Sequence, residues 1–119
     1  PLGPHVAEWF ARQQFLADTP DLAAVALRVA DDVTQEQVGR PGAEDPEHVV
    51  LRQHRGLRQA FPVDSATAAV VGACDGRLPV GALIEAVRTL MEPDHDIDTV
   101  TVIDRVVDLI EAGVVHPVG

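Results

Sequence analysis

The spacing of hydrophobic residues changes near Asp64, and this change most limits what the chain can fold into. Before that point, Val25, Leu27 and Val29 alternate with other residues, which is typical of a half-buried strand. After it, apolar residues over 80–91 recur at the spacing of an amphipathic helix. The pattern therefore predicts an α+β fold in which the strands precede most of the helices.

An N-terminal helix and a small antiparallel β meander are expected before residue 64. The helix covers roughly residues 6–17, where Trp9 and Phe10 lie on an apolar face. Residues 47–59 stay open between a strand and a helix broken at Gly56. The strands are expected near residues 25–29, 33–38, 48–54 and 57–63.

Three short helices and a final short strand are expected from residue 64 onward. Asp64 and Asp98 have side chains that cap helix N-termini. Pro79 suits the first position of a helix, and Gly113 favours a helix end. With a strand over 114–117, this is the order of elements in a winged helix.

The chain is thus expected to have two segments, 1–63 and 64–119, which form one compact domain. In the second segment, the winged-helix order suggests that Leu78 pairs with residues 114–115 in a minimal sheet. The length of 119 residues fits one domain of this size.

The charge of the chain argues against a nucleic-acid-binding surface. All nine basic residues are arginine and there are 19 acidic residues, so the formal net charge is −10. The last helix, which would enter the DNA groove of a winged helix, carries four acidic residues against Arg105. They are Asp98, Asp104, Asp108 and Glu111. We therefore expect no DNA partner and a role for this half in packing or protein contact.

The clearest metal-like motif is an acidic run that does not complete a calcium loop. Asp94, Asp96 and Asp98 have the right opening spacing, but Thr99 stands where glycine is needed and Arg105 where a bidentate glutamate is needed. An acidic helix cap explains the run better. The histidines lack metal-ligand spacing, so no metal site is expected.

Catalytic and nucleotide-binding motifs are also missing from the sequence. Cys74 has no neighbouring base and is expected to be a buried structural thiol. The chain has no glycine-rich dinucleotide loop, and without lysine it has no Walker loop. We expect no catalytic and no cofactor-binding residues, and therefore no enzyme activity in this chain.

No signal peptide and no long apolar stretch occur in the sequence, so a cytoplasmic protein without a membrane partner is expected. The opening Pro1-Leu2-Gly3 is either native or the remnant of a protease site.

Several segments together resemble the C-terminal domain of actinobacterial class I S-adenosylmethionine-dependent methyltransferases, a domain of unknown function. The resemblance implies a preceding catalytic domain, similar to enzymes that modify ribosomal RNA bases or a glutamine side chain, which would hold the S-adenosylmethionine. In such proteins a Pro-Leu-Gly-Pro stretch leads into the tryptophan-containing helix, which favours a native Pro1. The segments are 8–16 (EWFARQQFL), 27–33 (LRVADDV), 36–37, 73–81 (ACDGRLPVG) and 111–117 (EAGVVHP).

Two hypotheses follow for function. In the first, the chain is a non-catalytic accessory domain that packs on the methyltransferase domain through Trp9 and Phe10, or contacts an anionic RNA or a protein substrate through Arg52, Arg55 and Arg58. In the second, it is a stand-alone acidic winged-helix module for protein interaction or regulation. The oligomeric state stays open.

Overall fold

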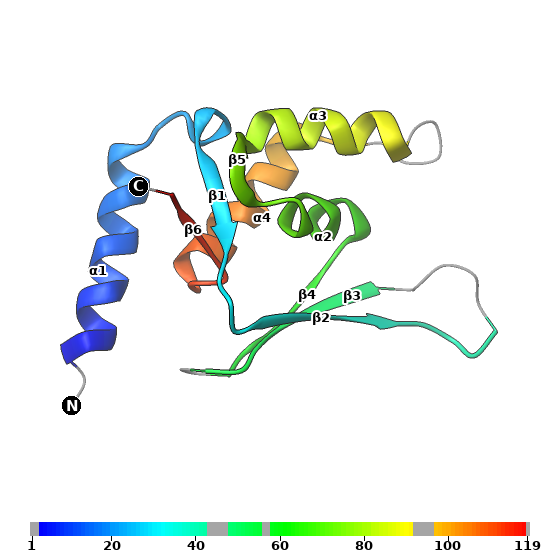
Figure 1. Cartoon of the computed structure of the whole chain (residues 1–119), viewed down its shortest axis with the longest axis horizontal. Coiled ribbons are helices and arrows are strands. Elements are labelled where there is room, and N and C mark those ends of the chain that lie inside the picture. The colour runs from blue at the N-terminus through cyan, green and yellow to red at the C-terminus, as the bar shows by residue number, and fades with distance from the viewer. Residues whose placement is uncertain (1–2, 43–47, 56–57, 92–96, 119) are drawn as a thin grey trace.

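The computed structural model describes residues 3–42, 48–55, 58–91 and 97–118. Within them the fold is α+β, as predicted, with four α-helices and two small antiparallel sheets (Figure 1). The elements are α1 (Gly3–Asp18), the 3-10 turn η1 (Leu22–Ala24), β1 (Ala26–Val29), β2 (Val33–Val38), β3 (His48–Gln53), β4 (Ala60–Val63), α2 (Ser65–Gly72), β5 (Asp75–Pro79), α3 (Val80–Met91), α4 (Thr99–Glu111) and β6 (Val115–Pro117).

One sheet, here called sheet B, is the meander β2-β3-β4. Its alternating sequence places Val49, Leu51 and Val63 on one buried face. The predicted strands over 33–38 and 48–54 are confirmed, and the alternative helix over 47–59 is wrong, because residues 48–53 pair with strands on both sides. The strand expected from residue 57 begins at Ala60.

The other sheet, here called sheet A, has the order β5-β1-β6 and corrects the predicted meander. The strand over 25–29 exists, but β1 pairs with β5 and β6 rather than with β2. The predicted pairing of Leu78 with residues 114–115 is also wrong, because β1 lies between those strands. The physical reason is burial: between β5 and β6, Leu27 is fully buried.

Local capping signals place the helix ends. The Asp64 side chain accepts a hydrogen bond from the Thr67 N–H at 2.7 Å, and the Asp98 side chain accepts one from the Val100 N–H at 3.3 Å. Gly113 follows α4 with a φ of 81°, as the predicted helix end requires. Pro79 ends β5 instead of opening α3, one residue from its expected place.

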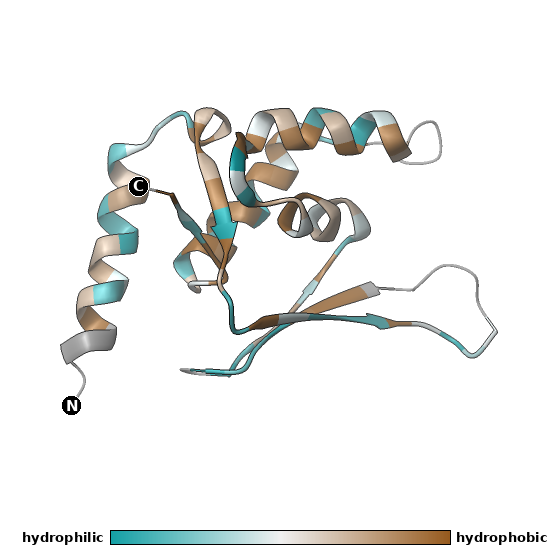
Figure 2. Cartoon of the chain, in the orientation of Figure 1, coloured by the Kyte–Doolittle hydropathy of each residue, from teal (hydrophilic) through white to brown (hydrophobic). Residues whose placement is uncertain are grey.

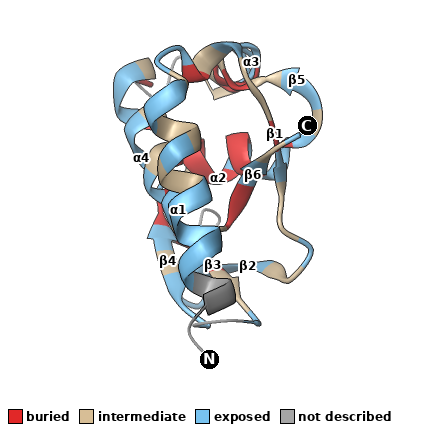
Figure 3. Ribbon diagram, turned by 90° about the vertical axis from the view of Figure 1, so that its left-hand side faces the viewer, coloured by how far each residue is buried: buried red, intermediate tan, exposed pale blue. Residues whose placement is uncertain are grey.

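The core joins the helices to both sheets. The largest fully buried side chains include Leu27 of β1, Leu51 of β3, Ile84 of α3 and Ile110 of α4. Figure 2 shows that hydrophobic residues of β1, α2, α3 and α4 lie close together, and Figure 3 shows that buried residues gather in the interior while α1 is largely exposed. No helix in the described part of the chain is long and apolar enough to cross a membrane.

Candidate functional site

The most conspicuous exposed apolar surface lies on the N-terminal half of α1. Val6, Trp9 and Phe10 are 44%, 47% and 60% exposed. The Trp9 and Phe10 rings contact each other edge to face, with centroids 5.0 Å apart and an angle of 78°. We call these three side chains the α1 apolar face. Their i, i+3, i+4 spacing places them on one side of the helix, as predicted for Trp9 and Phe10.

The C-terminal half of α1 holds the helix on the domain. Phe15 and Leu16 are half-buried and pack against the core. Arg12 Nε donates a hydrogen bond of 2.9 Å to the carbonyl oxygen of Glu111, at the end of α4. The α1 apolar face therefore lies on the part of the helix that stands away from the core (Figures 1 and 3).

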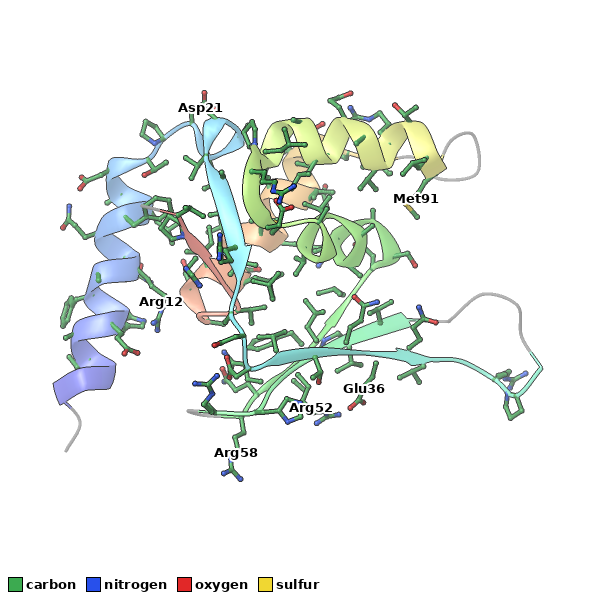
Figure 4. All side chains as sticks on the ribbon, in the orientation of Figure 1. Arg12, Asp21, Glu36, Arg52, Arg58 and Met91 are labelled. Atoms are coloured by element: carbon green, nitrogen blue, oxygen red, sulfur yellow. The ribbon has the colours of Figure 1, made fainter. Side chains whose placement is uncertain are left out.

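The three arginines predicted to contact an anion lie at one end of sheet B, where carboxylates already engage two of them. The guanidinium of Arg52 is paired with both carboxylate oxygens of Glu36, at 3.0 and 3.3 Å. Arg55 pairs with Asp31 at 3.0 Å. Arg58 has a positive φ of 51° and forms no ion pair within the described residues. Figure 4 shows Arg52 and Arg58 extending from the same side of the sheet.

The pairing of Arg52 with Glu36 changes the proton affinity of both side chains. The hydrogen bond from Arg52, followed by its positive charge, lowers the pKa of Glu36, and the same contacts raise the pKa of Arg52. Folding thus lowers the proton affinity of Glu36, so the pair stabilises the fold above the ordinary glutamate pKa. That contribution is lost as the pH falls through the lowered pKa.

Replacing Arg52 with glutamine is expected to raise the pKa of Glu36 toward its ordinary value, because the charged hydrogen-bond donor is gone. The side-chain carboxyl resonance of Glu36, followed by NMR from neutral to acidic pH, measures this change. Arg55→Gln is the matched control and leaves the pKa of Glu36 unchanged, since Arg55 pairs with Asp31. An identical Glu36 titration in the wild type and in Arg52→Gln would contradict the assignment.

The remaining candidates for catalysis or metal binding do not form a reactive site among the described residues. Cys74 is buried and donates to the Val70 carbonyl oxygen at 3.3 Å, and burial raises its pKa to about 11, as fits a structural thiol. His54 is exposed, with Nε2 2.7 Å from the Thr34 hydroxyl. Asp94 and Asp96 lie outside the described residues, within which no cluster of His, Cys, Asp and Glu can hold a metal ion.

A groove between sheet B and α2 was missed at the sequence level. It has a volume of about 320 Å³, and its walls are small or uncharged side chains from three elements that only the tertiary fold brings together. In the sequence, only the alternation of Gln35 and Gln37 with Glu36 pointed to this groove, because it puts both amide side chains on one face of a strand. The lining residues are Gln35, Gln37, Val49, Ser65, Ala68, Ala69 and Gly72.

Comparison with protein families identifies the family of the chain. The model of a family described as a domain of unknown function, DUF7782, matches residues 7–117. The search of curated proteins finds no match.

Proposed function

The chain belongs to the DUF7782 family, and on this premise we propose that it is a non-catalytic accessory domain of a class I S-adenosylmethionine-dependent methyltransferase. The observation that carries the proposal is the α1 apolar face, exposed on a helix whose other half is anchored to the domain. The sequence segments that resemble such methyltransferases supply the identity of the partner. The expected cytoplasmic location belongs to the same proposal.

Aromatic side chains exposed in this way favour protein contact. Tyrosine, tryptophan and phenylalanine are enriched in the centres of protein interfaces, where they add large contact areas for little side-chain entropy. Covering Trp9 and Phe10 with a second domain would also remove apolar surface from water. In the resembling methyltransferases the catalytic domain precedes this region, so the connection would enter through α1.

The ion pairs of sheet B favour packing over contact with an anionic substrate. Arg52 and Arg55 would have to exchange Glu36 and Asp31 for a phosphate, which those neighbouring carboxylates repel. Arg58 has no such constraint, so it is the arginine that an RNA phosphate would contact most easily. A direct contact of this domain with RNA therefore stays secondary to its contact with the catalytic domain.

The groove beside α2, as the described residues form it, does not fit S-adenosylmethionine. The groove beside α2 has no carboxylate among its lining residues to accept hydrogen bonds from ribose hydroxyls. The cofactor therefore belongs to the catalytic domain in this proposal.

A stand-alone winged-helix interaction module is the second candidate. The order α2-β5-α3-α4-β6 supports it, with β1 taking the place between the two flanking strands of sheet A. The exposed side of α4 carries Asp104, Asp108 and Glu111, a charge distribution suited to a protein partner rather than to DNA. In either case residues 1–63 and 64–119 would act as one unit, because β1 of the first segment lies between β5 and β6 of the second.

The test is association of this chain with the methyltransferase domain, produced as a separate polypeptide. Trp9 is the single tryptophan of the chain, so selective labelling makes its fluorescence a direct reporter of burial. Binding is expected to shift its emission to shorter wavelength. The change Val6→Ala combined with Phe10→Ala is expected to weaken the complex at least about tenfold, as loss of interface anchors does.

The matched control is Leu90→Ala, which removes an apolar side chain that is 83% exposed on α3 and should leave the affinity unchanged. Calorimetric titration of S-adenosylmethionine into this chain alone should give no saturable heat. Micromolar binding of S-adenosylmethionine to this chain, or equal affinity of the α1 variant and the wild type for the catalytic domain, contradicts the proposal.

A further inference from the structure

Sheet B ends on one side in β2, whose outer backbone edge has no partner strand among the described residues. His54 N–H donates to the Asp32 carbonyl oxygen across the β2-β3 ladder at 3.0 Å. Because bonded and non-bonded pairs alternate in an antiparallel ladder, the N–H and C=O groups of Gln35 and Gln37 point away from β3. Within the described residues no hydrogen bond meets them there, and the strand order places β2 at the edge of the sheet, as Figure 3 shows.

The other outer strands of the two sheets carry a residue that discourages pairing. Pro62 lies in β4, Pro79 in β5 and Pro117 in β6. Proline lacks the N–H that an added strand needs, and proteins place it on edge strands to prevent association. The six residues of β2 include no proline, so this edge alone among the four is open to a further strand.

The charge on β2 has also been neutralised. An edge carboxylate such as Glu36 normally repels an approaching strand. Here Arg52 holds Glu36 on the side of the sheet opposite the groove, with both carboxylate oxygens engaged. The strand therefore offers an uncharged backbone edge, with the Gln35 and Gln37 amides facing the groove.

The groove lies where the side chains of an added strand would go. A strand paired with β2 runs about 4.8 Å from it, and every second side chain points toward the α2 side of the sheet. There it meets Ser65, Ala69 and Gly72, which leave room for small uncharged side chains. The remaining side chains face solvent near Thr34 and Glu36.

We propose that β2 and this groove bind an extended peptide by strand addition, with small uncharged residues on the groove side and basic residues on the other. Backbone hydrogen bonds to Gln35 and Gln37 supply the affinity, and the groove selects side-chain size. The net charge of −10 attracts a cationic peptide to the chain over long range, while Arg52 and Glu36 on the solvent side compensate each other and leave that face without a repelling charge. This site goes beyond the proposed function and does not rest on it, since the α1 apolar face takes no part.

The test uses the full chain and the probe peptide acetyl-Lys-Ala-Thr-Val-Lys-Ala-Thr-amide. Its second, fourth and sixth residues match the groove side. At about 1 mM peptide, hydrogen exchange at the Gln35 and Gln37 amides is expected to slow at least about tenfold, because these N–H groups gain partners. The Thr34 and Glu36 amides, which already face β3, are expected to change little.

Two matched comparisons separate backbone pairing from charge attraction. The same peptide with N-methyl groups on the backbone nitrogens that face β2 keeps every side chain, and it should give no protection. Gln35→Pro removes an outward N–H that no internal bond uses, as Pro62 does on β4, and should abolish binding. Thr34→Ala, on the opposite face, should bind the peptide as the wild type does.

Equal protection by the N-methylated peptide, equal binding by folded Gln35→Pro, or no protection from the probe overturns the proposal. Protection that grows with protein concentration in the absence of peptide would show that a second copy occupies the edge, and it also overturns the proposal. None of these readouts involves the methyltransferase domain, so failure here is distinguishable from failure of the proposed function.

Discussion

Leu27→Ala is expected to lower the free energy of unfolding by about 2–5 kcal/mol, a large part of the total stability of a domain of this size. Leu27 is fully buried on β1, the middle strand of sheet A, and strands on both sides hold its backbone in place. The surrounding side chains therefore cannot close over the cavity. Urea denaturation followed by far-ultraviolet circular dichroism measures the loss.

The same variant tests whether residues 1–63 and 64–119 form one cooperative unit. Since β1 from the first segment separates two strands of the second, the transitions of Trp9 fluorescence and of helical content should stay coincident in Leu27→Ala. Leu90→Ala is the control, because it removes an equal number of atoms from an exposed side chain and should cost less than about 0.5 kcal/mol. Separate transitions for the two probes would show that the segments fold independently.

The errors in the predicted fold come from interactions between residues distant in sequence. Caps and turns depend on neighbouring residues, so Asp64, Asp98 and Gly113 were placed correctly. Alternation on β1 indicates which side chain is buried, but it carries no information about the partner strand. The burial of Leu27 among helices that follow it by many residues decided that choice.

The candidate surfaces also combine features that the local sequence predicts with features that depend on residues distant in the sequence. Helical spacing placed Trp9 and Phe10 on one face, but it does not show where α1 lies on the domain, which involves contacts such as that of Arg12 with the Glu111 carbonyl, 99 residues away in the sequence. Arg52, Arg55 and Arg58 form a visible cluster in the sequence. The carboxylate partners of Arg52 and Arg55, however, come from β2 and from the turn before it. Such pairing cannot be deduced without the register of the strands.

Gly76→Ala is expected to destabilise the fold by about 2 kcal/mol, because Gly76 has a φ of +86° that costs an L-residue about 1–2 kcal/mol. A Cβ there would also stand 2.8 Å from Val118 Cγ2 and 3.2 Å from Arg28 Nη2. Gly76 lies at an irregularity in the pairing of β1 with β5. Asp75 pairs with Arg28 and Pro79 pairs with Ala26, so β5 has more residues than β1 between these two pairs. We expect this irregular pairing to need the backbone conformation of Gly76.

Gly72→Ala makes the same chemical change at the end of α2 and should have the opposite sign. A Cβ there meets no atom within 4 Å, and its φ lies outside the positive region. Alanine lowers the entropy of the unfolded chain and favours the helix, which stabilises by about 0.5–1 kcal/mol. Urea midpoints of the two variants should therefore fall on opposite sides of the wild type. A shared sign would mean that backbone conformation at Gly76 does not control the pairing of β5 with β1.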